Sequence, residues 1–354
     1  MRNLISAVLL AAALSLVGCS RSGSASASPV DARAVVPAGD GRIRICFIPK
    51  NVGNPYFDAI SSGFYNAIAQ LGEDNFEYVY TGPETAEADS QIPFVEEAIR
   101  KGVDAIFIAA NSNDALNDVF DRARAAGIRV YSINQDIPGS ESHRDAAIMP
   151  VNFEAVGAAQ IELMGALMDY QGQFAILSAT VDAPDQNVWV ALMKAELAGN
   201  PAYSRMELVE VAYGDDQAEK SAAETIGLLE RWPNLGGILA PTAVGLPAAA
   251  GVARDRGLAG RVKVTGLGLP SEMAEFVLDG SCEGFQLWNP PYEGYVGVCL
   301  VWAEKKEGFV PTPGAVFSAG MLGDYAILPN GQILTLETPM LYDRSNILEY
   351  SILF

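Results

Sequence analysis

The sequence predicts an α/β protein made of two doubly wound, parallel-sheet lobes. Short apolar runs rich in β-branched residues alternate with amphipathic segments at helical spacing. The alternation runs from residue 43 to about residue 150 and then starts again, which gives two halves of similar size. No close sequence repeat joins the halves, so the prediction of two lobes rests on this pattern.

The first strand–loop–helix unit, residues 43–71, also places a candidate site. Its apolar run ends at Pro49, because proline cannot donate to a sheet ladder. Asn54 can then cap a helix that holds proline in its first turn. Ligands of open α/β sheets bind at the carboxyl ends of the strands. The residues expected near this strand end are Lys50, Tyr56 and Phe57.

The later elements follow from the same periodicities. Further strands are expected at residues 76–80, 104–110, 128–133, 146–151, 173–179, 206–212, 236–240, 262–267 and 282–287. Helices are expected at residues 86–101, 115–126, 153–170, 185–197, 217–231, 246–256, 273–279 and 292–306. Short polar strands and turns fill residues 320–354, which could cross back between the lobes.

The N-terminal residues predict export. Residues 1–19 have a basic start and a short apolar stretch, and they end in a lipobox-like sequence at Cys19, the expected lipidation site. An ordinary secretory peptide followed by a chance cysteine is the alternative. Residues 20–40 are rich in Ser, Ala, Gly and Pro and predict a flexible tether. We therefore expect a periplasmic or cell-surface protein that a lipid anchor alone holds at a bacterial membrane.

Composition excludes several classes of function. The formal net charge of −20 argues against nucleic acid, whose phosphates need clustered Lys and Arg. The sequence has one histidine, His143, which excludes a His-rich metal site. His143 lies in a polar stretch and is interpreted as a solvated loop residue. The sequence has neither of the glycine-rich motifs that cradle nucleotide phosphates. We expect no cofactor and no metal.

The cysteines show no spacing typical of a redox or zinc motif. Cys46 lies inside the first strand and is interpreted as a small buried hydrophobe. Cys282 and Cys299 could pair in an oxidising compartment, and the sequence leaves that open.

Polar and aromatic side chains follow most of the predicted strands. Carboxylates and amides can bind hydroxyl groups, and an aromatic ring can cover the apolar face of a sugar. These residues also have purely structural interpretations: Lys50 as a solvated loop residue, Asp185 as a helix cap and Trp288 as part of the core. Asp and Glu could form a glycosidase pair, but no spacing singles out two of them. The strand-end candidates are Lys50, Asn134, Asp136, Asp185, Gln186, Asn187, Thr242, Trp288 and Asn289.

Several blocks, in order, resemble the periplasmic sugar-binding proteins of ABC importers, and most closely the autoinducer-2-binding and rhamnose-binding branch. The blocks are residues 47–50, 80–83, 102–106, 127–130, 185–187, 240–241 and 246–250. The resemblance implies two α/β lobes joined by a three-stranded hinge, which trap the ligand as they close. It implies a first lobe of residues 43–150 with 269–310, and a second lobe of residues 151–268 with 311–345.

The resemblance also implies site residues. The positions that hold autoinducer-2 in its receptor are matched by Lys50, Asp185, Gln186, Pro241, Ala243 and Trp288. Two family aspartates are replaced by amides, at Asn134 and Asn289, which keeps a hydrogen-bond acceptor, adds donors and removes a charge. Asp136 could compensate for the missing carboxylate.

The resulting hypothesis is a monomeric, lipid-anchored solute-binding protein that delivers a small sugar-like ligand to an ABC permease in the inner membrane. It performs no chemistry. The Asp185–Gln186 pair ranks autoinducer-2 above a deoxyhexose or pentose. A receptor that senses the ligand for a chemoreceptor or sensor kinase is the alternative, and a secreted glycosidase is third.

Overall fold

The computed structural model describes residues 41–336 and 338–354. The expected signal peptide (1–19), the tether (20–40) and the lipidation site Cys19 lie outside the described residues. In the described part of the chain, no helix is both long and apolar enough to cross a membrane.

The first lobe contains a parallel sheet with the strand order β13-β5-β4-β3-β1-β2. Alternate side chains of β1 enter different cores: Phe47 belongs to one cluster and Ile48 to the other, as the pleat of a strand requires. The strands are β1 (Ile43–Ile48), β2 (Phe76–Tyr80), β3 (Ala105–Ile108), β4 (Arg129–Ile133), β5 (Ala146–Met149) and β13 (Gln332–Leu334).

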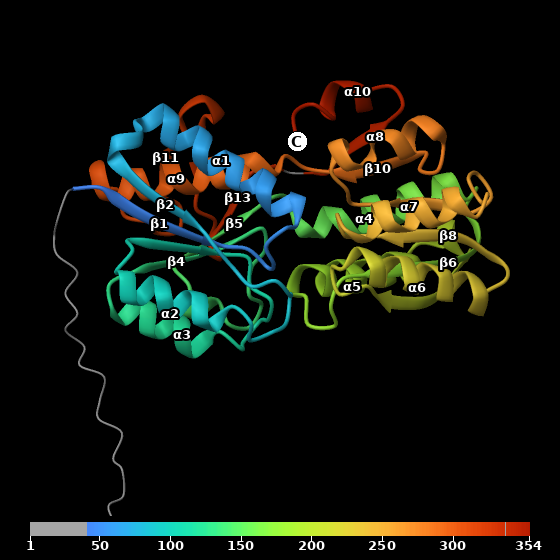
Figure 1. Cartoon of the computed structure of the whole chain (residues 1–354), viewed down its shortest axis with the longest axis horizontal. Helices are drawn as coiled ribbons and strands as arrows, with labels where there is room; N and C mark the ends of the chain where they lie inside the picture. Colours follow the sequence, from blue (N-terminus) through green and yellow to red (C-terminus); the bar gives the residue numbers. More distant parts are fainter. Residues whose placement is uncertain (1–40, 337) are drawn as a thin grey trace, which may run out of the picture. The chain divides into compact units, whose positions relative to one another are not determined.

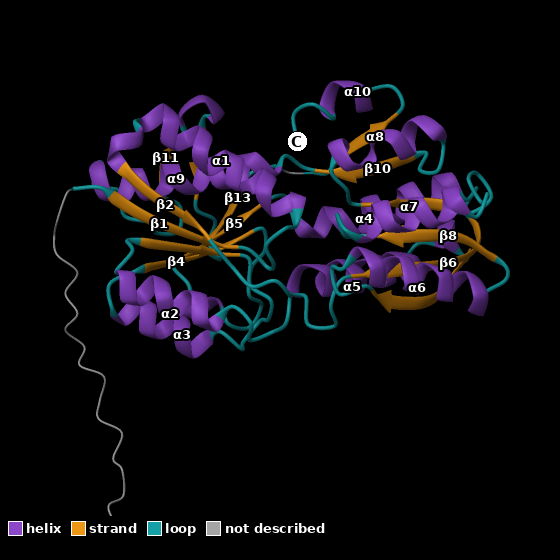
Figure 2. Cartoon of the chain, viewed as in Figure 1, coloured by secondary structure: helices purple, strands orange, loops and turns teal. Residues whose placement is uncertain are grey.

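Helices cover both faces of this sheet (Figure 1). On one face, α1 (Pro55–Leu71) packs against α9 (Pro290–Lys306), although the two are far apart in sequence. On the other face, α2 (Ile92–Lys101) packs against α3 (Asn117–Ala125). Figure 2 shows the resulting layers of helix, sheet and helix.

The second lobe contains a parallel sheet with the strand order β7-β6-β8-β9. Beside it, β10 pairs antiparallel with β14, and a bridge from Leu267 to Gln286 links the two sheets. The strands are β6 (Gln171–Ser178), β7 (Arg205–Tyr213), β8 (Leu235–Ala240), β9 (Lys263–Gly266), β10 (Gly284–Leu287) and β14 (Met340–Asp343).

In the second lobe, α4 packs against α5, and α6 packs against α7. The helices are α4 (Phe153–Leu167), α5 (Pro184–Gly199), α6 (Ala218–Arg231), α7 (Gly245–Asp255), α8 (Pro270–Asp279) and α10 (Ile347–Tyr350). Outside both main sheets, β11 (Val316–Ser318) and β12 (Asp324–Ala326) form a hairpin. The 3-10 helices are η1 (Glu73–Asn75), η2 (Glu141–His143), η3 (Pro201–Tyr203) and η4 (Gly320–Leu322).

The predicted fold class, with two parallel-sheet lobes, is confirmed, but residues at the end of the chain are distributed differently. Between its two sheets the described chain crosses after β5, after β10 and after β13. Residues 269–287 were expected in the first lobe, yet α8 packs on α7, and β10 contacts β9. β13 was expected in the second lobe, yet it pairs with β5. A three-residue strand carries too little periodicity to reveal its partner.

The helix expected at residues 86–101 begins only at Ile92. Pro93 lies in the first turn, where a helix tolerates proline. The preceding residue, Gln91, is fully buried and its side chain donates to the backbone oxygens of Pro49 and Ala109, both at 2.8 Å. The loop is therefore tied to the ends of two strands through a side chain, which periodicity does not reveal.

Among the described residues the cysteines are free and buried. Cys282 follows α8 in the second lobe, whereas Cys299 lies in α9 of the first. The pairing that the sequence left open is therefore absent. Burial raises the pKa of each of these thiols to about 12, so they remain protonated and unreactive at neutral pH.

Two glycines allow α1 and α9 to approach closely. A Cβ atom at Gly63 would lie 1.9 Å from the backbone oxygen of Pro291. A Cβ atom at Gly294 would lie 2.2 Å from the backbone oxygen of Ile60. Because both obstacles are backbone atoms, a side chain at either position would push the helices apart. This contact holds α9 on the first sheet, directly after the crossing from β10.

We predict that Gly63→Ala lowers the free energy of unfolding by about 1–3 kcal/mol, since overpacking displaces the helices. Urea unfolding measures it. Gly199→Ala is the control, because beyond its chain neighbours and the nearby backbone of its own helix no described atom lies within 4 Å of the added Cβ. Equal stability of the two variants would contradict the close helix contact.

Candidate functional site

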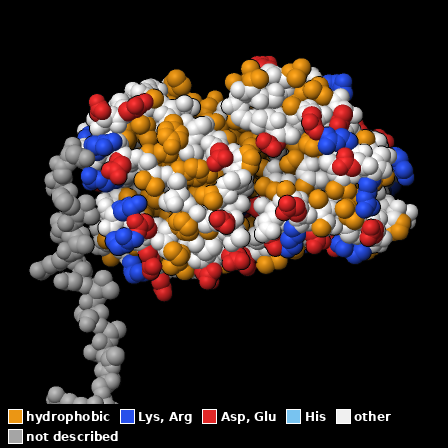
Figure 3. Space-filling model, in the orientation of Figure 1, with side chains coloured by type: hydrophobic (Ala, Val, Ile, Leu, Met, Phe, Trp, Pro, Cys, Tyr) orange, Lys and Arg blue, Asp and Glu red, His pale blue; other side chains and the backbone are white. Residues whose placement is uncertain are grey.

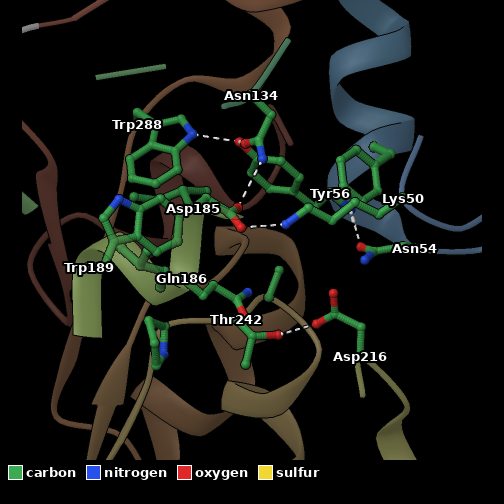
Figure 4. A pocket seen from close by; sticks show the side chains of 15 residues that line it. Lys50, Asn54, Tyr56, Asn134, Asp185, Gln186, Trp189, Asp216, Thr242 and Trp288 are labelled. Atoms are coloured by element: carbon green, nitrogen blue, oxygen red, sulfur yellow. Dashed lines mark hydrogen bonds and ion pairs between the residues drawn. The ribbon is translucent and has the colours of Figure 1, made fainter. Parts of the chain in front are cut away.

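A small cavity lies where the carboxyl ends of the strands of both lobes meet (Figure 4). Its volume is about 40 Å³, because side chains of the two lobes bond to each other across it. The first lobe contributes Lys50, Asn54, Tyr56, Phe57 and Asn134. The second contributes Asp185, Gln186, Trp189, Asp216, Pro241, Thr242, Ala243, Leu267, Leu287 and Trp288.

An ion pair joins the two lobes inside this cavity. Lys50 Nζ, after β1, donates to Asp185 Oδ1, in the first turn of α5, at 2.5 Å. Each residue is 3% exposed. The free-energy cost of removing both charges from water offsets much of their attraction, so the pair adds little to the stability of the fold. Polar groups of a ligand can therefore compete with it.

Asp185 is not the helix cap that the sequence offered as its structural role, although it lies close to that position. It lies in the first turn of α5, where the helix dipole favours a negative charge. The cap position itself is Ala183, whose side chain makes no capping bond. The carboxylate accepts from Lys50 and, through Oδ2, from Asn134 Nδ2 at 3.2 Å. Asp185 therefore faces the cavity as an acceptor.

Asn134 holds a backbone conformation that few residues tolerate. Its φ of 71° lies in the left-handed region, where Asn and Asp are enriched because their short polar side chains bond locally. Its Oδ1 accepts from the Tyr56 hydroxyl at 2.6 Å. Backbone geometry thus explains a short polar residue here, and the amide supplies both a donor and an acceptor.

Aromatic and aliphatic side chains form the other part of the lining. The rings of Trp189 and Trp288 pack at 5.6 Å between centroids. Trp288 is buried, and its Nε1 donates to the Tyr56 hydroxyl at 2.6 Å. Phe57 and Leu267 extend the apolar surface. The cavity is therefore amphipathic, with charged and amide groups beside indole rings.

A second carboxylate lies on the second-lobe side. Asp216 Oδ1 accepts from Thr242 Oγ1 at 2.7 Å (Figure 4). Burial raises the pKa of Asp216, while the positive charge of Lys50 opposes that shift. The neighbouring Gln186 is oriented by its carbonyl oxygen, which accepts from the Ala179 backbone N–H at 2.7 Å.

Most of the predicted site residues come together, but three do not. Asn187 is exposed, and its Nδ2 donates to the Val181 backbone oxygen at 2.8 Å. Asp136 is bound by Arg144, with Nε at 2.7 Å and Nη2 at 2.5 Å, and by Gln332 Nε2 at 2.8 Å. It lines a different cavity, of about 380 Å³, so it does not compensate for Asn134. Asn289 is the N-cap residue of α9, and its buried Oδ1 has no hydrogen-bond partner among the described residues.

The sequence analysis did not identify Asp216 and Trp189, which line the cavity, or Glu293, which lies behind it. Asp216 follows β7 by a short turn, so the strand-end rule used for the other candidates would have found it. Trp189 lies one helical turn after Asp185 and thus on the same helix face. Glu293 is a carboxylic acid in an otherwise apolar part of α9, and it is fully buried beside Tyr56.

His143 is paired with Asp121, its Nδ1 at 2.9 Å from Oδ1, at the surface of the first lobe. Over residues 41–336 and 338–354, no group of three or more His, Cys, Asp or Glu side chains is arranged to hold a metal ion.

We predict that Asp136→Asn lowers the free energy of unfolding by about 3–5 kcal/mol, because it leaves the buried guanidinium of Arg144 without a counter-charge. Urea unfolding tests this. Asp121→Asn, at an exposed carboxylate, serves as the matched control. If both variants unfold at the same urea concentration, Asp136 is not the structural partner of Arg144.

Comparison with known proteins agrees with this architecture. A sugar ABC transporter protein from Actinomyces odontolyticus is 35% identical, with a TM-score of 0.68 over 87% of this chain and 97% of that one. A solute-binding protein from Clostridium phytofermentas, solved with L-rhamnose, is 32% identical, with a TM-score of 0.83 over 88% and 99%. LsrB from Clostridium saccharobutylicum, solved with AI-2, is 21% identical over 87% and 99%, with a TM-score of 0.80, and shows a likeness of fold alone.

A family match covers most of the chain. Residues 45–308 match the family described as the periplasmic binding protein domain. The match includes the strand ends that form the cavity and the first crossings between the lobes. This chain is a member of the periplasmic binding protein domain family.

Proposed function

We propose that this protein is the solute-binding component of an ABC importer and captures a small sugar-like ligand between its lobes, without chemical conversion. The observation that carries the proposal is the buried Lys50–Asp185 pair, which spans the lobes inside an amphipathic cavity. A polyol can replace both partners, since its hydroxyl groups donate to the carboxylate and accept from the ammonium group.

The lining favours a deoxyhexose such as L-rhamnose as the ligand. The indoles of Trp189 and Trp288, with Leu267 and Leu287, provide apolar surface for a sugar face and a methyl group. The relative solved with L-rhamnose supports this class. It reverses the order that the sequence suggested, because the likeness to the AI-2 complex shows the fold alone.

Autoinducer-2 is the second candidate, and a specific observation favours it. The residues that match the autoinducer-2 positions in sequence also surround one cavity, namely Lys50, Asp185, Gln186, Pro241, Ala243 and Trp288. Asn134 lies among them where the receptors of this molecule carry an aspartate. The amide is the feature that would separate the two ligands.

The mechanism that we propose is closure of the lobes about their connections. A cavity of about 40 Å³ is far below the roughly 300–1,000 Å³ of ordinary small-molecule sites. A ligand must therefore separate Lys50 from Asp185 on entry, which moves the lobes apart at the crossings after β5, β10 and β13. Its own hydroxyl groups then hold the lobes together, and this differential affinity shifts the population to the closed form.

The same proposal includes export and delivery. Residues 1–19 would direct export, Cys19 would carry the lipid, and an inner-membrane permease would accept the ligand from the closed form. The described surface suits a soluble receptor: on the face in Figure 3, acidic and basic side chains are interspersed over both lobes. A receptor that feeds a sensor would use the same cavity, and growth on the ligand as carbon source separates the two roles.

We predict that L-rhamnose raises the melting temperature of residues 41–354 at millimolar concentration, because a ligand that binds only the folded state stabilises it by mass action. The panel also holds autoinducer-2 in borate-free buffer, ribose, xylose, galactose and erythritol. If autoinducer-2 alone raises the melting temperature, then autoinducer-2, and not L-rhamnose, is the ligand. No shift with any member would contradict the proposed class.

We predict that Asp185→Ala weakens binding of the ligand found in this panel by about 2–4 kcal/mol, because a buried hydroxyl group of the ligand loses the carboxylate that would accept its hydrogen bond. Calorimetric titration measures the dissociation constant. Asp255→Ala, at an exposed carboxylate of α7, is the control and should bind as wild type does. Equal affinity of the Asp185 variant would reduce Asp185 to a helix-terminal residue.

A further inference from the structure

The side chain of Glu293 lies behind the cavity at the centre of a hydrogen-bonded row. Its Oε1 is 3.0 Å from the Tyr56 hydroxyl oxygen, which also contacts Asn134 Oδ1 at 2.6 Å and Trp288 Nε1 at 2.6 Å. Asn134 in turn contacts Asp185 through Nδ2. The row thus leads from a fully buried carboxyl group to the ion pair between the lobes.

Counting donors fixes the direction of each bond. The indole of Trp288 can only donate, so the Tyr56 oxygen accepts from it. The amide nitrogen of Asn134 donates to the Asp185 carboxylate, so its Oδ1 faces Tyr56 as an acceptor. The single proton of the Tyr56 hydroxyl therefore goes to Asn134, its nearest acceptor. No proton of Tyr56 remains for the contact with Glu293.

We propose that Glu293 is a neutral carboxylic acid in the folded protein and acts as a positioning residue. It donates its proton to Tyr56, which fixes Asn134 so that the amide N–H group, rather than the carbonyl, faces Asp185 and the cavity. The inference deepens the proposed function: Asn134 presents a donor to the ligand, and a hydroxyl or ring oxygen of the ligand would accept from it.

The surroundings of Glu293 favour the neutral form. Burial raises its pKa well above the usual value, and the negative charge of Asp185 raises it further. Its other oxygen, Oε2, has no hydrogen-bond partner among the described residues, which a carboxylate would tolerate poorly. A hydrogen bond donated by Tyr56 would lower this pKa, but the Tyr56 proton is used by Asn134, which leaves the Asn134 backbone N–H to oppose the shift.

The elements packed against α9 bring few other charges near Glu293. On α1, the acidic residue Asp58 is already bonded to the Tyr80 hydroxyl. β5, β11 and η4, which also contact α9, contain no charged residue. Lys50 acts on this region from beyond Asp185, to which it is paired. The titration of Glu293 is therefore coupled mainly to Asp185.

The first test needs no ligand. Relative to Glu293→Gln, wild type should lose stability as pH rises from 5 to 7. A carboxyl group that is protonated when folded and ionised when unfolded makes unfolding release a proton. The ratio of the two unfolding equilibrium constants should therefore change by up to about tenfold per pH unit. A constant ratio would show that Glu293 ionises normally, and would overturn the proposal.

Infrared spectroscopy keeps the test decisive if Glu293→Gln does not fold. At pH 7 the protein should show the carbonyl stretch of a protonated carboxyl group. The other described carboxyl groups with a raised pKa are Asp216 and Glu304. The double variant Asp216→Asn/Glu304→Gln keeps Glu293 and must keep a band. If the double variant shows no carbonyl band of a protonated carboxyl group, the proposal is overturned.

The positioning role is tested on the ligand found by the thermal-shift panel. Wild type and Glu293→Gln should bind equally at pH 5, and only wild type should lose affinity as Glu293 ionises at higher pH. Parallel pH profiles would overturn the positioning role. A protein that binds no member of the panel would contradict the proposed function, whereas the stability and infrared measurements would still decide the protonation of Glu293.

Discussion

The buried ion pair between Lys50 and Asp185 is the interaction on which the rest of the site depends. The two charges come from different lobes and meet at 2.5 Å in a region closed to water. Desolvation offsets much of their attraction, so the pair keeps the lobes together only weakly. A ligand that satisfies both charges can therefore compete with the pair, and this competition couples binding to the movement of the lobes.

The parallel-sheet fold itself brings Lys50 and Asp185 together. All strands of a parallel sheet end at the same edge, so one polar residue after β1 and one after β6 suffice when the two edges face each other. The close contact of Gly63 with Pro291 holds α9 against α1 and carries the chain back to the first lobe. Behind the ion pair, Tyr56 and Glu293 orient the amide that completes the site.

Much of this arrangement could be predicted from the sequence, for physical reasons that also mark the limits. Apolar runs ending at turn residues identified the strands, and the strand-end rule identified Lys50 and Asp185. The same rule failed for Asp136, because it does not say whether a loop residue turns toward the cleft or toward a cation in its own lobe. The pairing of β13 depends on tertiary contacts. Glu293 is recognisable in the sequence as a lone acidic residue in an apolar part of a helix. Its role could not be predicted, because it depends on Tyr56 and Asn134, which are distant in sequence.

A crystal structure of residues 41–354 with the ligand identified by the thermal-shift panel would show directly whether the ligand displaces the ion pair. We expect ligand oxygens between Lys50 Nζ and the Asp185 carboxylate, with the direct contact between the two side chains replaced and the Asn134 amide nitrogen donating to the ligand. A ligand bound in the separate cavity beside Asp136, with the Lys50–Asp185 bond intact, would contradict it.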